Sequence, residues 1–341
     1  MTKVFVFGPT ENSHVKKWNS FYEGCAISLY TLHGAGKNQI LSILLRFLKV
    51  FSETILGKYD ICHVHFASSY GILFRLLALR SNVSVISIWG TDFNRFFGDV
   101  GFLYRVWGVI ILWALKRYDY VNVPSLDIYR KIEEIGIDEK KIILMQYGIE
   151  LGVIKDSLSN THVFNMANRF ISVRNFSQLY NIEFLINGFS RVCKNICFEL
   201  QIVGTGTPSE CERIKSLISG LNDDRIHYIG LVDSNELIKR LIEAEYFVSI
   251  PSMDGLSLVV LEALACRCKG LVSDIPSYQN KLFSATCEFI ELSDMSQFTT
   301  QIEAMISSKK LDNPKSQDLE AYDIEKNRIK FRKIIGLHYG E

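Results

Sequence analysis

Two successive series of alternating strands and helices constrain the fold of this chain more than any other feature of the sequence. The first series runs from a short buried strand at Val4–Phe7 to another at Ile142–Met145. The second starts with a strand at Phe170–Val173 and continues to a strand at Gly270–Ser273. Alternation of this kind is typical of parallel sheets with helices on both faces. We therefore expect an α/β protein with two such sheets.

The length of the chain fits two domains of about 150 residues each. We predict an N-terminal domain over 1–150 and a second domain over 151–318, with the loosest stretch, 151–168, between the two series. A charged helix is predicted over 319–341, and the sequence leaves open whether it packs back on the N-terminal domain. Because parallel sheets bind ligands at the carboxyl ends of their strands, we expect the chemistry in a cleft between the domains.

Charge and cysteine usage exclude several classes of protein. The formal net charge of +1 gives no indication of nucleic-acid binding. Residues 1–150 carry 17 Lys and Arg against 13 Asp and Glu, a bias whose sign suits an anionic membrane surface. None of the eight cysteines forms a Cys-x-x-Cys pair, so we expect reduced thiols and no zinc site. The N-terminal apolar run stops at Gly8 and is too short for a signal peptide, so we expect a cytoplasmic protein.

An acidic loop between a buried strand and a helix carries the clearest chemistry. Asp254 lies in this loop, and Glu262 follows eight positions later, inside the helix. A carboxylate accepts two hydrogen bonds from hydroxyl groups, so Asp254 can hold a hexose and Glu262 a ribose. Gly255 lets the backbone approach a ligand, and the N–H groups of Leu256 and Ser257 at the helix start suit a diphosphate. The alternative is an ordinary helix cap with a surface aspartate.

The order of residues around this loop resembles the E-x(7)-E motif of retaining glycosyltransferases with the GT-B fold, the family numbered four. The usual pattern, close to S-x-x-E-G-x-x-x-x-x-x-E-A-x-A, is matched at Ser252, Gly255, Glu262, Ala263 and Ala265. Asp254 replaces the first glutamate and is one methylene shorter. The resemblance implies that Asp254 contacts the donor sugar and Glu262 the ribose. It also implies two Rossmann-like domains that face a cleft.

Three further segments of the second half resemble the donor side of the same family. Arg174 follows the strand that opens the second series, where the family has an arginine that grips the diphosphate. Tyr180 stands six residues later, where the family usually has a lysine with the same role. Gly204 and Gly206 resemble the glycine loop beside the base and the diphosphate. The resemblance therefore implies a donor site in the second domain.

Residues of the first half resemble the acceptor side of this family. His14 and Lys17 belong to a loop similar to S-x-H-x-x-R-W, directly after the first strand. His65 ends a strand, and Asp92 closes a turn in which Trp89 stands where many relatives have a histidine. The resemblance implies contacts with the acceptor or with phosphate. A packed histidine and a turn-forming aspartate are the alternatives that the sequence leaves open for His65 and Asp92.

The resemblance also implies a reaction. We expect a retaining hexosyltransferase that moves a hexose or an N-acetylhexosamine from a nucleoside-diphosphate sugar, a UDP-sugar, to a hydroxyl of a glycan. Front-face attack, in which the leaving diphosphate takes the proton of the acceptor, is the mechanism favoured for such enzymes. The fold usually works without a bound metal, and the sequence has no Asp-x-Asp triplet. We therefore expect no metal and no cofactor apart from the donor, which is a co-substrate.

Basic and apolar helices in the first half indicate a membrane partner. They are predicted at 38–56, 72–80 and 103–117, where apolar residues at helical spacing alternate with Lys and Arg. This pattern favours a peripheral contact with the inner face of the plasma membrane, and hence a lipid-linked glycan acceptor in O-antigen or capsule synthesis. Ordinary core-facing helices are the alternative.

Three alternative functions differ from this one in the residues that they require. A sugar-nucleotide epimerase on the same fold requires an array of acids and bases around the sugar, and the acidic residues found here are few. An NAD-dependent dehydrogenase requires a G-x-G-x-x-G loop, and the loop that starts at Gly8 lacks this spacing. A catalytically inactive partner with the same fold is kept open by Asp254 and Tyr180, which depart from the family pattern.

Overall fold

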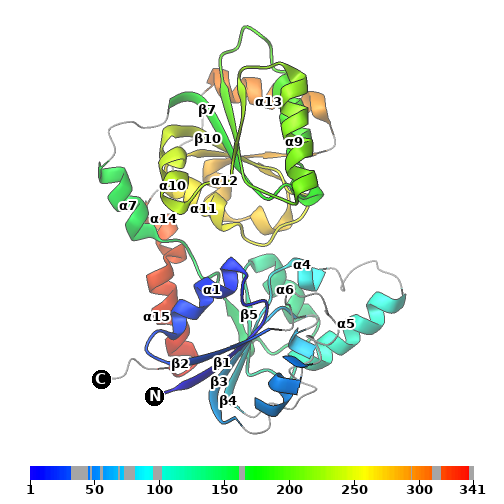
Figure 1. Cartoon of the computed structure of the whole chain (residues 1–341), viewed down its shortest axis with the longest axis vertical. Helices are drawn as coiled ribbons and strands as arrows, with labels where there is room; N and C mark the ends of the chain where they lie inside the picture. The colour runs from blue at the N-terminus through cyan, green and yellow to red at the C-terminus, as the bar shows by residue number, and fades with distance from the viewer. Residues whose placement is uncertain are drawn as a thin grey trace. The chain divides into compact units, whose positions relative to one another are not determined.

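The computed structural model describes residues 1–31, 45–46, 48–53, 57–67, 70–72, 81–94, 102–160, 166–292, 294–308 and 316–337. The chain forms two compact units (Figure 1). Unit 1 consists of Met1–Tyr147 and Glu325–Glu341, and unit 2 consists of Gly148–Ile324.

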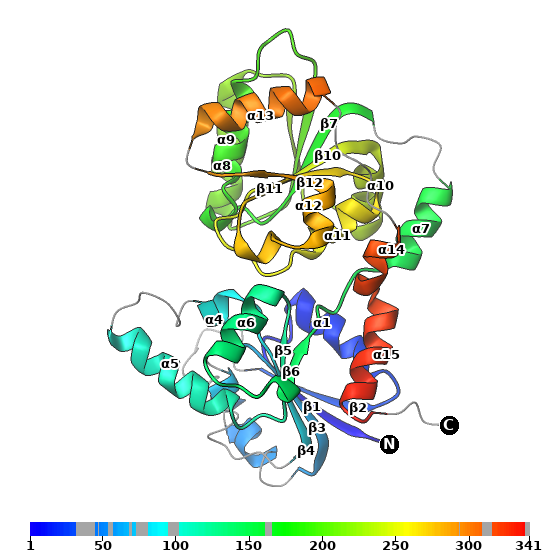
Figure 2. The ribbon, with the colours of Figure 1, turned by 180° about the vertical axis from the view of Figure 1, so that it is seen from behind.

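Unit 1 is built on a six-stranded parallel sheet with the strand order β2-β1-β3-β4-β5-β6. Its strands are β1 (Lys3–Phe7), β2 (Ala26–Tyr30), β3 (Tyr59–His65), β4 (Ser81–Ser87), β5 (Tyr120–Val123) and β6 (Ile142–Leu144). Its helices are α1 (Ser13–Asn19), α4 (Thr91–Asn94), α5 (Phe102–Leu115), α6 (Leu126–Glu134) and α15 (Ile324–Ile334), of which α15 returns from the end of the chain. Figure 2 shows α1 and α15 on one side of this sheet and α5 and α6 on the other.

Helix α15 is fixed to unit 1 by both apolar and polar contacts. The Phe331 ring packs against the buried Trp18 ring of α1, with centroids 4.9 Å apart. Arg332 is buried and donates hydrogen bonds to the carbonyls of Phe21 and Glu23 at 3.2 and 3.0 Å. Asn327 donates to the Gln146 carbonyl at 3.0 Å. The last helix thus packs beside α1 on the same face of the sheet.

Unit 2 repeats the architecture with the strand order β12-β11-β10-β7-β8-β9, again all parallel. Its strands are β7 (Met166–Val173), β8 (Glu199–Val203), β9 (Ile226–Gly230), β10 (Ala244–Ser249), β11 (Lys269–Ser273) and β12 (Cys287–Ile290). Its helices are α7 (Leu151–Asn160), α8 (Ile182–Ser190), α9 (Pro208–Leu221), α10 (Ser234–Glu243), α11 (Leu258–Ala265), α12 (Lys281–Thr286), α13 (Met295–Ser308) and α14 (Ser316–Leu319). The expectation of two parallel sheets with helices on both faces is confirmed.

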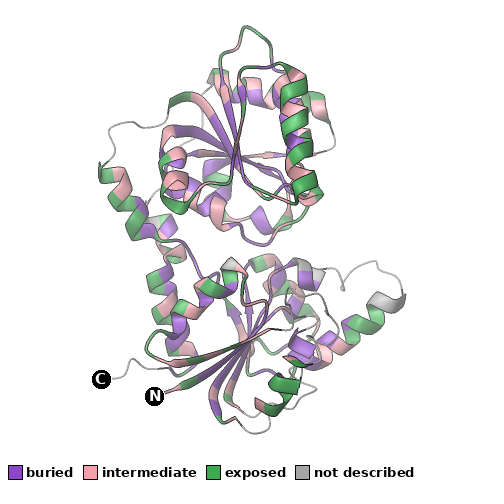
Figure 3. Cartoon of the chain, in the orientation of Figure 1, coloured by how far each residue is buried: buried purple, intermediate pink, exposed green. Residues whose placement is uncertain are grey.

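Two apolar cores lie on opposite faces of the second sheet. Helices α8, α9 and α13 cover one face and contribute residues such as Leu185, Ile214 and Phe298. Helices α7, α10, α11 and α12 cover the other face, with residues such as Leu241 and Leu261. Strands β8, β10 and β11 are buried along most of their length (Figure 3). Two covered faces explain the apolar stretches inside these strands, such as Tyr246–Val248 in β10.

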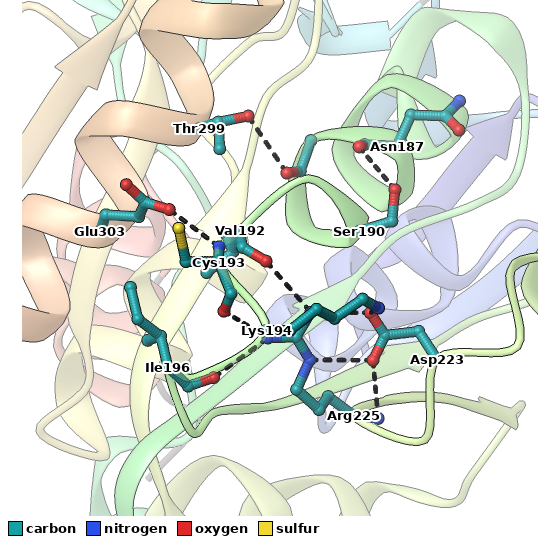
Figure 4. Close-up of polar contacts among 11 residues, drawn as sticks. Asn187, Ser190, Val192, Cys193, Lys194, Ile196, Asp223, Arg225, Thr299 and Glu303 are labelled. Carbon is teal, nitrogen blue, oxygen red and sulfur yellow. Dashed lines mark hydrogen bonds and ion pairs between the residues drawn. The ribbon is translucent and has the colours of Figure 1, made fainter.

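A network of hydrogen bonds and an ion pair around Arg225 stabilises the turn between α8 and β8 (Figure 4). Arg225 donates to the carbonyls of Val192, Cys193 and Ile196 at 3.0–3.2 Å and forms an ion pair with Asp223 at 2.7 Å. The hydrogen bond from Arg225 holds the pKa of Asp223 well below its usual range, so this carboxylate stays charged. The guanidinium satisfies carbonyl groups that the end of α8 leaves without helical partners.

Three elements differ from the prediction. Residues His14 and Lys17, expected in a loop, lie in helix α1. The stretch 151–168, expected to be loose, contains α7, whose Leu151 and Ile154 are buried in the core below α10 and α11. The helix expected over 319–341 is α15 and begins only at Ile324, because Glu320–Tyr322 form a separate 3-10 turn and Asp323 makes an isolated parallel bridge with Ile149. The N–H of Ile149 donates to the Tyr322 carbonyl at 2.8 Å, and the N–H of Ile324 donates to the Ile149 carbonyl at 3.0 Å. The helix predicted over 38–56 is seen at 45, 46 and 48–53, and its other residues lie outside the described part of the chain.

Candidate functional site

Arg174 is held at the carboxyl end of β7 by the neighbouring strand. Its Nε and Nη2 atoms donate to the Ser249 hydroxyl at the end of β10, at 2.8 and 2.6 Å. Nη2 also donates to the Tyr278 hydroxyl at 2.7 Å and lies 2.9 Å from Asp254 Oδ2. Burial lowers the pKa of Arg174, but Tyr278 and Asp254 raise it more, so the net shift is upward. The site therefore contains a fixed, permanently charged guanidinium.

The Asp254 carboxylate faces this guanidinium. Its Oδ2 atom accepts from the Tyr278 hydroxyl at 2.8 Å, and its Oδ1 atom accepts from the Gly255 N–H at 2.8 Å. The aspartate side chain, one methylene shorter than the glutamate of the family, is thus turned toward Arg174 in this structure. Its predicted contact with donor-sugar hydroxyls stays a prediction.

Tyr180 covers the face of the same guanidinium. Its ring centroid lies 5.0 Å from the Arg174 Cζ atom, within the range of a cation–π contact. Burial, and then the charge of Asp254, raise the pKa of Tyr180, so its hydroxyl stays neutral. At the position where the family has a second cation, this chain therefore places an aromatic ring that supports the first.

Ser252 joins the loop after β10 to the loop before α8. Its N–H donates to the Leu179 carbonyl at 2.9 Å, and its hydroxyl accepts from Asn181 Nδ2 at 2.9 Å. Asn181 also donates to the Ile250 carbonyl at 2.8 Å and has a left-handed backbone, with φ 52°. These bonds set the position of Tyr180, which directly precedes Asn181.

The glycine loop after β8 lies against the backbone of Arg174. Gly204 has φ 148°, and a Cβ atom there would lie 1.9 Å from the Arg174 carbonyl oxygen. At Gly206, a Cβ atom would lie 2.7 Å from a carboxylate oxygen of Glu210. Glu210 and Thr207 form a capping box at the start of α9. Glycine at 204 is therefore required for β8 and Arg174 to come this close.

Helix α11 carries the remaining donor-side residues. Ser257 precedes the helix and is buried, and its side chain makes no capping hydrogen bond. Leu256 is buried in the core, and Glu262 is half-buried one turn into the helix. Because the first N–H groups of a helix have no partner within it, the start of α11 offers donors beside Asp254.

Ser249 and Tyr278 complete the donor-side cluster but were not predicted from the sequence. Ser249 is fully buried at the last position of β10, and Tyr278 is fully buried in a 3-10 turn after β11. Neither residue belongs to a motif. Ser249 could have been found from its place at the end of a buried strand, because the carboxyl ends of parallel strands lie at one edge of the sheet.

The residues of unit 1 that were predicted for the acceptor side lie around Trp89 and Tyr147. The His14 ring lies 5.0 Å from the Trp89 ring, and the His65 ring lies 5.8 Å from it. The Nδ1 atom of His14 is 2.6 Å from the Tyr147 hydroxyl. Lys17 places its Nζ atom 5.8 Å from the centre of the Tyr147 ring. The structure thus brings His14, Lys17 and His65 together, and adds Tyr147, which was not predicted.

His65 and Asp92 are both buried below this cluster. Both ring nitrogens of His65 are buried and have no hydrogen-bond partner among the described residues. Burial, with a smaller effect of His14, lowers the pKa of His65 to about 3, so the ring is neutral. Asp92 accepts from the N–H groups of Ala67 and Trp89 at 2.8 and 2.9 Å. Asp92 therefore holds the turn that carries Trp89, and its predicted acceptor contact stays a prediction.

Two protein-family profiles match the chain, one within each unit. The profile described as Glycosyl transferase 4-like matches residues 3–125, and the profile Glycosyl transferases group 1 matches residues 167–308. No curated protein sequence matches significantly.

Solved glycosyltransferase structures share the fold. HepE of Anabaena in complex with UDP has a TM-score of 0.74 and 9% identity, covering 98% of this chain and 100% of that one. Sucrose-phosphate synthase of Thermosynechococcus elongatus has a TM-score of 0.70 and 14% identity, covering 98% and 94%. The lipopolysaccharide outer core galactosyltransferase WaaB, in its apo form, has a TM-score of 0.63 and 14% identity, covering 98% and 99%.

Two Rossmann-like units, each matched by a glycosyltransferase profile, define a glycosyltransferase with the GT-B fold. The chain belongs to the family 4-like glycosyltransferases.

Proposed function

We propose that this glycosyltransferase moves a hexose or an N-acetylhexosamine from a UDP-sugar to a hydroxyl of a glycan, with retention of the anomeric configuration. The observation that carries the proposal is the fixed, charged guanidinium of Arg174 beside Asp254 and the glycine loop. HepE, which shares the fold, has been crystallised with UDP and with UDP-glucose, and this supports UDP as the nucleotide.

In the proposed reaction, the bond between the anomeric carbon and the diphosphate oxygen breaks while the acceptor oxygen bonds on the same face of the sugar. The acceptor proton passes to the leaving diphosphate. Catalysis then rests on stabilising the negative charge that develops on the diphosphate and on positioning the acceptor. Arg174 supplies the charge stabilisation, and Glu262 holds the ribose. We propose that no resident metal takes part, in keeping with the absence of an Asp-x-Asp triplet from the sequence.

Replacing either carboxylate of the motif tests this assignment. We expect Glu262→Ala and Asp254→Ala to lower kcat/KM for sugar transfer by about 100-fold or more, because each removes hydrogen bonds to the donor. The measurement is release of UDP from a UDP-sugar in the presence of a glycan acceptor. Asp224→Ala, which removes an exposed carboxylate elsewhere in unit 2, is the control. Full activity in both motif variants would contradict the donor-site assignment, and a folded wild-type protein without transfer would favour an inactive partner.

We propose further that the acceptor is lipid-linked and that unit 1 contacts the inner face of the plasma membrane, as in the synthesis of a surface polysaccharide. Helix α5 buries Ile111 and Leu115 but exposes Val106 and Val109, which lie three positions apart on one face, at 42% and 68%. Exposed basic residues flank this stripe: Arg105 before it, and Lys116 and Arg117 after it. Among the described helices, none is long and apolar enough to cross a bilayer. An apolar stripe bordered by cations matches an anionic lipid surface.

A second helix adds to this face of unit 1. Residues 48–53 bury Val50 in the same apolar core as α5 and expose Leu48 and Phe51. We expect the protein to sediment with phosphatidylglycerol vesicles at low salt, and Val109→Glu to weaken this binding about tenfold or more, because a carboxylate replaces an inserted apolar group. Ile329→Glu, at an exposed position of α15, is the control. A wild-type protein that stays in solution would contradict the membrane contact.

A further inference from the structure

Tyr278 occupies an unusual place between the two charged groups of the donor site. It lies in the 3-10 turn Pro276–Tyr278, and its side chain is fully buried. Its hydroxyl accepts a hydrogen bond from Arg174 Nη2 at 2.7 Å and donates its own proton to Asp254 Oδ2 at 2.8 Å. One hydroxyl thus links the cation to the anion, and neither of the family motifs includes it.

The hydrogen bonds of Arg174 are divided unequally between its nitrogen atoms. A guanidinium has five N–H groups in a rigid fork. The Nε and Nη2 groups are engaged by Ser249, Tyr278 and Asp254. Within the described part of the chain, no residue accepts a hydrogen bond from Nη1. The protein therefore fixes one edge of the fork and leaves the two N–H groups of Nη1 for another acceptor.

We propose that Tyr278 is a positioning residue that orients Arg174, so that Nη1 is presented to the diphosphate of the donor. The proposal rests on the proposed function and adds a specific residue to it. Ser249 fixes the same edge of the fork from the neighbouring strand, and the Tyr180 ring limits movement out of the plane. The three contacts together leave the guanidinium one orientation.

The two charged partners of Tyr278 also contact each other. Asp254 Oδ2 lies 2.9 Å from Arg174 Nη2, so the carboxylate attracts the same edge of the fork that the Tyr278 hydroxyl contacts. The Tyr278 hydroxyl accepts from Arg174 and donates to Asp254, so it satisfies both groups at a fixed separation. Without it, a buried N–H group and a carboxylate oxygen would each lose a partner and would rearrange.

The substitution Tyr278→Phe tests this role, because it removes the hydroxyl and keeps the ring that packs against Phe283. We expect the affinity for UDP, measured by calorimetry, to fall about tenfold or more, since charge-assisted hydrogen bonds to the diphosphate depend on the orientation of Arg174. The affinity for UMP should change much less. The ratio of the UDP to the UMP affinity is therefore the decisive quantity, because a general loss of structure would lower both affinities together.

A matched control and a second variant complete the experiment. Tyr246→Phe also removes a buried tyrosine hydroxyl from unit 2, one that donates to the Met305 carbonyl at 3.1 Å, and should leave the ratio unchanged. Ser249→Ala should lower the ratio of the UDP to the UMP affinity as Tyr278→Phe does. It tests the positioning of Arg174 if the tyrosine variant fails to fold. An unchanged ratio in a folded Tyr278→Phe protein, or in Ser249→Ala where the tyrosine variant does not fold, would overturn the positioning of Arg174 while the proposed function stands. A wild-type protein that binds neither nucleotide would overturn the proposed function and this inference with it.

Discussion

Replacing Arg174 by alanine should lower kcat/KM for sugar transfer by about 100- to 1,000-fold, the range seen when one preorganised charge-stabilising donor is removed from an active site. Arg174 is the only cation that the structure places against Asp254 in the described part of unit 2. The family's second cation is replaced by Tyr180, which has no charge at neutral pH. We therefore expect Arg174 to be the main cationic side chain that stabilises the diphosphate in the proposed donor site.

Arg174→Lys separates the effect of charge from that of geometry. Lysine keeps the positive charge, but an ammonium group has no planar fork that could engage Ser249, Tyr278 and Asp254 while also binding a diphosphate. We therefore expect this variant to recover only a small part of the lost activity. Arg213→Ala is the control, because it removes an arginine of the same unit that is paired with Glu183. An Arg174→Ala protein with nearly normal activity would contradict the central role of this guanidinium.

Replacing Gly204 by alanine should destabilise unit 2 by about 3 kcal/mol or more, because backbone strain of about 1–3 kcal/mol adds to a steric clash in a packed site. The backbone φ of 148° disfavours a side chain, and the added Cβ atom would lie 1.9 Å from the Arg174 carbonyl oxygen. Because the obstructing atom belongs to the backbone, it cannot move aside as a flexible side chain would. Either β8 or β7 must shift, and the shift displaces Arg174 itself.

The matched control for this prediction lies in the same unit. Gly220 is in α9, and a Cβ atom there meets nothing within 4 Å, so Gly220→Ala should be neutral or stabilise by up to about 1 kcal/mol. Thermal unfolding followed by circular dichroism measures both variants. All four tryptophans belong to unit 1, so their fluorescence gives an internal reference. Equal melting temperatures for Gly204→Ala and the wild type would show that the glycine loop tolerates a side chain.

The fold was largely predictable because apolar runs and their breakers mark most of the strands. The strands predicted at Val4–Phe7 and Gly270–Ser273 agree with β1 and β11 to within one residue. Strand β2 was missed because it lies at the sheet edge and is only half-buried, so its sequence lacks a continuous apolar run. Helix α7 was missed because its Asp, Ser and Asn residues resemble a loop, whereas packing of Leu151 and Ile154 stabilises it.

Only those residues of the candidate site that belong to motifs were predictable from the sequence. Arg174 and Asp254 were singled out from separate segments, and the structure brings them into contact. Ser249, a partner of Arg174, and Tyr278, a partner of both, depend on the order of the strands, which places β10 between β7 and β11. Spacing along the chain does not reveal that order. The same limit applies to the position of Asp254, whose orientation toward Arg174 follows from Tyr278 and not from the motif.

The most direct test of the central claim is a thermal-shift measurement of the purified wild-type protein against UDP, GDP, ADP, their sugar conjugates and NAD. A ligand at 100 times its dissociation constant stabilises the folded state by about 2.7 kcal/mol, which is readily detected. We predict clear stabilisation by UDP and by one or more UDP-sugars. Stabilisation by NAD alone, or by none of these nucleotides in a folded sample, would contradict the assignment of a nucleoside-diphosphate-sugar site to unit 2.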